Sequence, residues 1–214
     1  MMISLRITEI FYSLQGESTR VGLPTVFVRL TGCPLRCQYC DTAYAFHGGE
    51  KRSIQDILSQ VAEFRGHYVC VTGGEPLAQP GCLILLKELC DAGYNVSLET
   101  SGALSIADVD TRVMVIMDIK TPGSLESDKN QLSNLEYIKP VDQLKFVLCS
   151  RADYDWACDM LKQDNLLDYA QVLFSPSWGQ LDPAVLADWI IADCLQVRFQ
   201  LQLHKLLWHD NPGH

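Results

Sequence analysis

The 214-residue sequence has no long hydrophobic run and few basic residues for its number of acidic ones. No apolar stretch approaches the roughly 20 residues that a helix needs to cross a bilayer, and we recognise no signal peptide. The 17 lysines and arginines against 26 aspartates and glutamates give a net charge of −9, whereas broad nucleic-acid binding needs a basic face. We therefore expect neither a membrane nor a nucleic acid as partner, and favour a small-molecule ligand.

The sequence also lacks linkers, low-complexity tracts and internal repeats, so we expect residues 1–214 to form one domain. An apolar fraction of 48% and a charged fraction of 20% are typical of a globular protein, and this length allows a large core. The nine cysteines, an odd number, indicate a reducing compartment. We expect a cytoplasmic protein.

Extended and helical patterns alternate along the chain. Apolar, β-branched runs predict strands over residues 25–30, 68–72, 95–99, 113–119, 143–148, 170–174 and 197–203. Amphipathic patterns and helix-capping residues predict helices over residues 53–65, 83–92, 151–163 and 182–193. Ser53 and Asp56 have the spacing of a capping box, and Gly93 is typical of the left-handed residue that ends a helix. Repeated strand–helix units with short connections are typical of an α/β fold with a parallel sheet, either open or partly closed as a barrel.

Three cysteines, Cys33, Cys37 and Cys40, lie in the eight-residue stretch CPLRCQYC. Three thiolates so close together cannot all pair as disulfides, and they are one ligand short of a tetrahedral zinc site. They suit a [4Fe–4S] cluster whose fourth iron is open to a non-protein ligand. A structural zinc site that recruits His47 is an alternative. The other cysteines are more typical of small buried side chains: Cys70, Cys82, Cys90, Cys149, Cys158 and Cys194.

Polar or glycine-containing segments follow most of the predicted strands. They occupy residues 33–37, 72–76, 99–102, 118–122, 175–177 and 204–205. In parallel α/β folds, ligands bind at the carboxyl ends of the strands, where loops and helix N-termini converge. We therefore expect these segments to form a single active site.

The segment Gly73-Gly74-Glu75-Pro76 contains residue types that suit the binding of a ligand. Paired glycines let the backbone approach a ligand closely, and an ammonium group could bind both backbone carbonyls and a carboxylate. Taken alone, the segment would equally suit a plain turn. It follows the cysteine triplet by one strand–helix unit, however, and this combination resembles the radical S-adenosylmethionine (SAM) superfamily. In that superfamily, a GGEP motif holds the amino group of SAM.

Further matches are spread along nearly the whole chain. They are IFYSLQGES (residues 10–18), FVRL (residues 27–30), CDT (residues 40–42) and QLHK (residues 202–205). With these segments, the sequence resembles the 7-carboxy-7-deazaguanine synthases, radical SAM enzymes of queuosine and deazapurine biosynthesis. The resemblance implies a partial (β/α) barrel of the radical SAM type, with parallel strands and reduced helices.

The resemblance also implies a reaction. Members of this family are carbon–nitrogen lyases that convert 6-carboxy-5,6,7,8-tetrahydropterin into 7-carboxy-7-deazaguanine and ammonia. The implied cofactors are a [4Fe–4S] cluster, SAM and Mg²⁺. The implied partners are a flavodoxin- or ferredoxin-type reductant and a second copy of the chain in a homodimer.

Residue roles follow from the resemblance by position. Cys33, Cys37 and Cys40 would bind the cluster, and Thr42 would help to hold Mg²⁺. The implied pterin contacts are Leu14, Gln15, Gly16, Glu17, Arg29, Thr72, His204 and Pro212. The implied SAM contacts are Tyr39, Cys40, Asp41, Gly74, Ser101, Asp118, Ile119, Lys120, Ser175 and Ser177. No catalytic side chain is implied, because the reactive species is the 5′-deoxyadenosyl radical.

Two other functions stay open at this point. A glycyl-radical-enzyme activating protein shares the cysteine triplet but acts on a protein partner, whereas residues 14–17 and His204 favour a small pterin. A non-catalytic iron–sulfur or zinc protein would leave residues 73–76 and the other polar strand ends without a role.

Alanine at Cys33, Cys37 or Cys40 is expected to abolish the broad visible absorbance of an iron–sulfur cluster, because each thiolate supplies one iron ligand. Cys82→Ala and Cys158→Ala are the matched controls and should retain it. Absorption spectra with iron and sulfide analysis of anaerobically purified variants measure the effect. Loss of the cluster in either control, with the triplet dispensable, would contradict the assignment.

Overall fold

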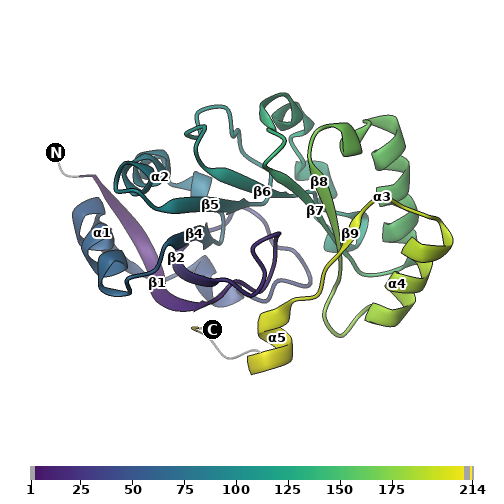
Figure 1. Cartoon of the computed structure of the whole chain (residues 1–214), viewed down its shortest axis with the longest axis horizontal. Helices are drawn as coiled ribbons and strands as arrows, with labels where there is room; N and C mark the ends of the chain where they lie inside the picture. The colour runs from purple at the N-terminus through teal and green to yellow at the C-terminus, as the bar shows by residue number, and fades with distance from the viewer. Residues whose placement is uncertain (1–2, 210–212, 214) are drawn as a thin grey trace.

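The computed structural model of the chain describes residues 3–209 and 213. Within them, nine strands form one open sheet in the order β3-β1-β2-β4-β5-β6-β7-β8-β9 (Figure 1). The strands from β2 to β9 run parallel, and β1 pairs antiparallel with both β2 and β3. The α/β fold with a partial barrel of parallel strands, as predicted from the sequence, is therefore confirmed.

The elements have the following bounds. The strands are β1 (Ser4–Leu14), β2 (Pro24–Leu30), β3 (Glu50–Ser53), β4 (Tyr68–Gly73), β5 (Asn95–Thr100), β6 (Met114–Asp118), β7 (Gln143–Leu148), β8 (Gln171–Pro176) and β9 (Arg198–Phe199). The α-helices are α1 (Ile54–Glu63), α2 (Gly81–Asp91), α3 (Arg151–Gln163), α4 (Pro183–Ala192) and α5 (Leu203–Trp208). The 3-10 helices are η1 (Ala43–Phe46), η2 (Pro76–Ala78), η3 (Pro122–Ser124), η4 (Ser127–Lys129), η5 (Leu132–Tyr137) and η6 (Leu166–Asp168). In the described part of the chain, no helix is long and apolar enough to cross a membrane.

Local sequence signals place several helix ends correctly. The Ser53 hydroxyl accepts a hydrogen bond from the Asp56 N–H, and the Asp56 carboxylate accepts one from the Ser53 N–H. This capping box satisfies backbone donors that the first turn of α1 leaves unpaired. After α2, Gly93 has a φ of +89°, the left-handed conformation that ends many helices. Both features were predicted from the sequence.

Two strands of the antiparallel edge, β1 and β3, were not predicted. In β1, full burial is confined to Leu5 and Ile7, so only its first half carries an alternating apolar signal. The four residues of β3 are all polar and at least partly exposed. Edge strands that bury little apolar surface leave no periodic pattern in the sequence.

The predicted strand over residues 197–203 is wrong in its second half. Only β9 pairs with the sheet, through β8, and the chain leaves the sheet after the Gln200 N–H donates to the Phe174 carbonyl. The Leu203 N–H then donates to the carbonyl of Gly16 at 3.0 Å, and α5 begins there. His204 and Lys205 therefore lie in a helix and do not follow a strand, because the loop after β1 holds this segment away from the sheet.

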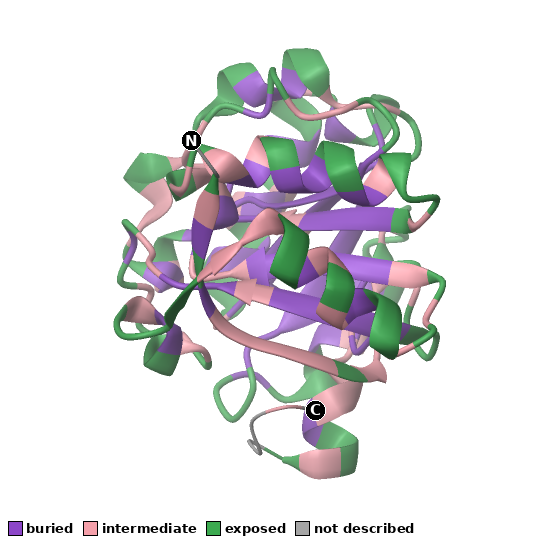
Figure 2. Ribbon diagram, turned by 90° about the vertical axis from the view of Figure 1, so that its left-hand side faces the viewer, coloured by how far each residue is buried: buried purple, intermediate pink, exposed green. Residues whose placement is uncertain are grey.

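Side chains of the parallel strands alternate between an apolar outer face and a polar inner face. On the outer face, α1 and α2 cover the first strands of the sheet, and α3 and α4 cover β6, β7 and β8 (Figure 1). Figure 2 shows the strands largely buried, while the outer sides of the helices are exposed. The inner face bears, among others, Arg29, Thr72, Glu99, Asp118 and Lys145. These side chains line a cavity because the helices occupy the opposite face.

Glu75 ties the loop after β4 to the end of β5. Its carboxylate accepts hydrogen bonds from the Ser101 N–H at 2.7 Å, the Ser101 hydroxyl at 2.6 Å and the Thr100 hydroxyl at 3.0 Å. It also accepts one from the Leu77 N–H, and the side chain is fully buried. The carboxylate therefore braces the loop after β4 against the end of β5.

Glu75→Gln is expected to lower the free energy of unfolding by about 1.5–3 kcal/mol, because the amide cannot accept all the hydrogen bonds that the buried carboxylate accepts. Urea unfolding of the cluster-free protein measures this loss. The control, Glu88→Gln, changes an exposed glutamate of α2 and should be neutral. Equal stability of the two variants would show that Glu75 does not brace the loops.

Candidate active site

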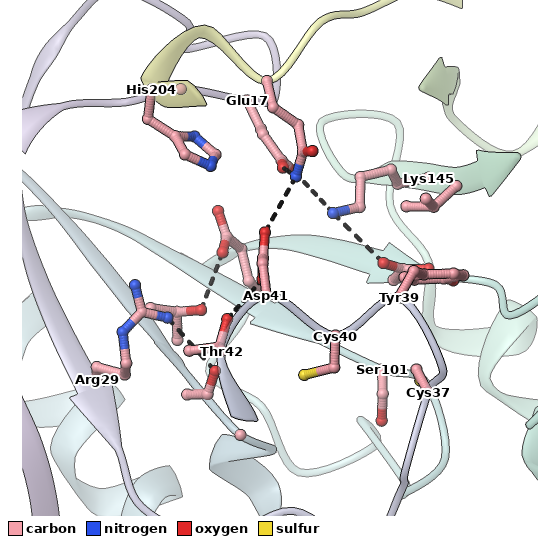
Figure 3. A pocket seen from close by; sticks show the side chains of 18 of the residues that line it. Glu17, Arg29, Cys37, Tyr39, Cys40, Asp41, Thr42, Ser101, Lys145 and His204 are labelled. Carbon is pink, nitrogen blue, oxygen red and sulfur yellow. Dashed lines mark hydrogen bonds and ion pairs between the residues drawn. The ribbon is translucent and has the colours of Figure 1, made fainter. Parts of the chain in front are cut away.

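A cavity of about 270 Å³ opens at the carboxyl ends of the parallel strands (Figure 3). It brings together most of the site residues that the sequence predicted, from segments distributed over the whole chain. These residues are Leu14, Gln15, Gly16, Glu17, Arg29, Cys33, Cys37, Tyr39, Cys40, Asp41, Thr42, Thr72, Gly74, Ser101, Asp118, Lys120, Ser177 and His204. The expectation that polar strand ends form one site agrees with this arrangement.

The three cysteines of the loop after β2 are free, half-buried and line the cavity. Burial raises the pKa of the Cys37 thiol to about 11 and also raises the pKa of Cys33 and Cys40. Ligation by iron must therefore displace protons from these thiols. Three thiols from one loop are the soft donor set that an iron–sulfur cluster requires, so the residues fit this group.

The zinc alternative finds less support in the geometry. His47, the ligand it would recruit, is exposed and does not line the cavity. Across residues 3–209 and 213, no three histidine, cysteine, aspartate or glutamate side chains converge tightly enough to hold a single metal ion.

The cysteine loop and the GGEP segment pack directly against each other. The Glu75 N–H donates to the Gly32 carbonyl at 2.8 Å. A Cβ atom at Gly74 would lie 2.0 Å from the Gly32 carbonyl oxygen, so a larger residue would push the two loops apart. Glycine is required at position 74 by this close backbone contact.

Arg29 forms one wall of the cavity. Its Nε donates to Glu9 Oε1 at 2.7 Å, and the Tyr44 hydroxyl donates to the same oxygen at 2.7 Å. Burial opposes the charge of Arg29, but Tyr44 and Glu9 more than offset it and raise the pKa of the guanidinium. Arg29 is thus a fixed, permanently charged group with donors that suit a carboxylate.

Alternating charges form a second wall, across from Arg29. Lys145 Nζ lies 2.6 Å from Glu17 Oε2 (Figure 3). It also lies 3.3 Å from Asp118 Oδ2, and Lys120 Nζ lies 3.1 Å from the same Asp118 oxygen. Burial opposes ionisation of both carboxylates, but the lysines outweigh it and lower the pKa of Glu17 and of Asp118. The pKa of Lys145 is raised by the same pairs against its burial. All four groups are therefore charged.

Asp41 and Thr42 offer oxygen atoms on the side of the cavity near α5. The Thr42 hydroxyl donates to Asp41 Oδ1 at 2.7 Å, and Lys205 Nζ lies 3.2 Å from Asp41 Oδ2. Partial desolvation opposes ionisation of Asp41, whose side chain is 34% exposed, but Lys205 and the Thr42 hydrogen bond outweigh it and lower its pKa to about 2. A hydroxyl beside an ionised carboxylate is a donor set of the kind that Mg²⁺ prefers, so these residues fit this ion.

The cavity also contains hydrogen-bonding atoms that have no partner. The Tyr39 hydroxyl and Asp118 Oδ1 are buried and form no hydrogen bond within the described part of the chain. Buried polar atoms are usually paired, so each is available to a polar ligand. Tyr39 lies between the second and third cysteines and Asp118 ends β6, so a ligand beside the cysteine loop would reach both.

Gly16 and His204 join the two ends of the chain at the mouth of the cavity. A Cβ atom at Gly16 would lie 2.2 Å from His204 Nδ1, so only glycine lets α5 approach this closely. Next to them, the Gln15 amide donates to Glu99 at 3.3 Å, and the Thr72 hydroxyl donates to the same carboxylate at 2.9 Å. The loop after β1 therefore closes over the strand ends.

Two predicted site residues of the described part of the chain do not line the cavity. Ile119 belongs to the outer apolar core, and its N–H donates to the Lys145 carbonyl at 2.8 Å. Ser175 is buried in β8 and does not line the cavity. Pro212 lies outside the described residues.

Several residues of the cavity wall were not predicted as site residues. They include Tyr44, Lys145 and Gln202, whereas Glu99 and Lys205 belong to the polar segments that we expected at the active site, without an assigned contact. For Lys145 a signal was available, because polar Gln143 and Lys145 alternate with apolar Leu144 and Phe146 in a parallel strand. Such alternation places a lysine on the inner face.

Comparisons with known proteins agree with this geometry. A model of the Radical SAM superfamily matches residues 27–115. A 7-carboxy-7-deazaguanine synthase from Chlorobaculum tepidum is 46% identical over 208 residues, 96% of this chain and 94% of that protein. A protein of the same name from Koribacter versatilis is 41% identical over 219 residues, 95% of this chain and 97% of that protein.

Among solved structures, the fold resembles that of QueE from Escherichia coli, with a TM-score of 0.77 and 22% identity, over 94% of this chain and 95% of that one. This likeness concerns the fold alone. The sequence identities above extend over almost the whole length of both chains, and the cysteine triplet lies inside the matched superfamily segment. The chain therefore belongs to the 7-carboxy-7-deazaguanine synthase family of the Radical SAM superfamily.

Proposed function

We propose that this chain is a 7-carboxy-7-deazaguanine synthase, a lyase that converts 6-carboxy-5,6,7,8-tetrahydropterin into 7-carboxy-7-deazaguanine and ammonia. The observation that carries the proposal is the meeting of three groups in one cavity. Three free thiols, the Arg29 guanidinium and the Glu17 carboxylate line the same cavity. A substrate with a carboxylate at one end and an amino-pyrimidinone at the other matches the two charged groups.

Enzymes of the Radical SAM superfamily use a [4Fe–4S] cluster together with SAM to generate the carbon-centred radical that removes a hydrogen atom from the substrate. In this chain, Cys33, Cys37 and Cys40 would hold the cluster. Gly74, Ser101, Asp118, Lys120, Tyr39, Asp41 and Ser177 line the cavity and are the proposed SAM contacts. The Tyr39 hydroxyl and Asp118 Oδ1 support this assignment, because both are buried without a partner among the described residues.

The pterin contacts follow from the two charged walls. Arg29, fixed by Glu9 and Tyr44, binds the substrate carboxylate with its remaining donors. Glu17, kept ionised by Lys145, accepts hydrogen bonds from the N–H groups of the pyrimidinone. Leu14, Gln15, Gly16, Thr72 and His204 complete the proposed pterin site. Together these contacts orient the substrate and displace water from the cavity.

Thr42 is the proposed protein ligand of Mg²⁺, beside Asp41. A metal ion held by one hydroxyl can keep most of its water and still meet the substrate carboxylate. We also propose one domain, a homodimer, and a flavodoxin- or ferredoxin-type reductant, all on the basis of the family resemblance. The nine free thiols support a reducing, cytoplasmic location.

Anaerobic turnover tests the proposed reaction. Cluster-loaded protein incubated with the carboxy-pterin, SAM, Mg²⁺ and a reductant should release 7-carboxy-7-deazaguanine and ammonia, which chromatography with mass spectrometry detects. Cleavage of SAM without formation of this product would contradict the proposed substrate.

Glu17→Gln and Arg29→Ala are expected to raise the apparent substrate constant about tenfold to a hundredfold, because each removes a charged hydrogen-bonding contact worth roughly 1.5–3 kcal/mol. Their cluster content should stay normal, and each should still cleave SAM slowly when reduced in excess. Steady-state kinetics and iron analysis provide these values. Wild-type kinetics in both variants would contradict the pterin as substrate and favour a glycyl-radical-enzyme activating protein.

Thr42→Ala is expected to weaken the stimulation of turnover by Mg²⁺ while SAM binding changes little. The reason is that the lost hydroxyl is a ligand of the metal and not of the cofactor. Turnover measured over a range of Mg²⁺ concentrations, with SAM binding by calorimetry as the control, checks this. Equal turnover of the wild-type enzyme with and without Mg²⁺ would rule out the proposed role.

A further inference from the structure

Lys145 lines the cavity from β7, and the function proposed above gives it no contact with a ligand. Its side chain is 12% exposed, and its ammonium is paired with Glu17 (Figure 3) and also with Asp118. A lysine this deeply buried is costly unless its charge is compensated. The two carboxylates provide that compensation, so Lys145 has a fixed place between them.

The hydrogen bonds that Glu17 already accepts leave room for a ligand. Lys145 Nζ donates to Oε2 at 2.6 Å, and the Gln202 amide donates to Oε1 at 2.8 Å. An ionised carboxylate has about four acceptor positions, two on each oxygen. Each oxygen therefore keeps one position, and two adjacent N–H groups of an amino-pyrimidinone can occupy the pair. Lys145 and Gln202 together fix the orientation of the carboxylate.

The position of Lys145 is set by the sheet. Asp118 and Lys145 are direct partners in the register of β6 and β7. Asp118 Oδ2 is also held by Lys120 at 3.1 Å, so it stays ionised beside Lys145. This anchor involves protein groups alone, and Glu17 is therefore oriented before any ligand arrives. Such preorganisation increases affinity because less ordering remains to be done on binding.

We propose that Lys145 is a positioning residue of the pterin site, which acts through Glu17 by holding its carboxylate ionised and oriented toward the pyrimidinone N–H groups. The inference rests on the proposed function, since it concerns the same substrate. It separates Lys145 from Arg29, which contacts the substrate directly. Besides its proposed contact with SAM, the buried Asp118 then also anchors the lysine that orients Glu17.

Replacement by methionine keeps the length of the side chain and removes the charge. Glu17 then loses its ion pair while it remains buried, and it either turns away or takes up a proton. In either case it accepts fewer hydrogen bonds from the substrate. Because Lys145 acts through Glu17, its removal should change the affinity for the pterin little once Glu17 has been replaced by glutamine. The proposal therefore predicts strong non-additivity between the two positions.

The test is a double-mutant cycle on pterin binding. Wild type, Lys145→Met, Glu17→Gln and the double variant are prepared with their clusters, and calorimetry gives the dissociation constants of the carboxy-pterin and of SAM without reductant. Lys145→Arg keeps a cation and provides a second variant should the methionine variant fold poorly. The matched control is Lys139→Met, because Lys139 also pairs with a buried carboxylate, that of Asp142 at 3.0 Å, but outside the cavity.

We expect Lys145→Met to weaken pterin binding about tenfold to a hundredfold, and to add less than about threefold in the Glu17→Gln background. SAM binding should change less than about threefold, since Lys120 still pairs with Asp118. Lys145→Arg should recover part of the pterin affinity. Lys139→Met should bind both ligands like wild type, whatever it costs in melting temperature.

Two results would overturn the proposal. The first is an unchanged pterin constant in both Lys145 variants while Glu17→Gln weakens binding, which leaves the proposed function intact. The second is an equal effect of Lys145→Met in the wild-type and Glu17→Gln backgrounds, which would mean that Lys145 contacts the pterin itself. Failure of wild-type protein to bind the carboxy-pterin would instead refute the proposed function.

Discussion

The compensation of buried charge is the constraint on which this site depends. Lys120, Asp118, Lys145 and Glu17 follow one another across the cavity wall at ion-pair distances. Each of these groups would be strongly destabilising alone, and removal of one leaves its partner uncompensated. Two positive and two negative charges form a balanced series, which keeps every member ionised. The cavity can therefore present fixed charges to a ligand although these side chains are only 11–13% exposed.

The sheet can carry a polar inner face because its outer face is apolar and buried. Two apolar clusters, one under α1 and α2 and one under α3 and α4, bury the other side of the same strands. Successive residues of each strand face the apolar core and the cavity in turn, as Leu144, Lys145 and Phe146 illustrate in β7. Stability comes from one face of the sheet, and the ligand groups occupy the other.

Segments from both ends of the chain complete the site. The loop after β1 supplies Gln15, Gly16 and Glu17, and the segment that begins α5 supplies Gln202 and His204. They meet where the Leu203 N–H donates to the Gly16 carbonyl and where only glycine leaves space for His204. The proposed substrate contacts on this side thus depend on a joint between two distant segments. The cysteine loop, in contrast, is braced by the loop after the neighbouring strand β4, where Gly74 and Glu75 contact Gly32.

The sequence by itself determined the strand–helix alternation and the cysteine triplet, because periodicity and spacing are local properties. The individual contacts predicted for the cavity wall followed from the family resemblance, which short motifs carry. The sequence also placed the capping box of Ser53 correctly. Only the tertiary structure decided the use of Glu75 as a brace, the helical position of His204, and the partners of Lys145. Lys145 and Glu17 are 128 residues apart, and no local pattern encodes an ion pair over that distance. Register between strands and the meeting of the chain ends created it.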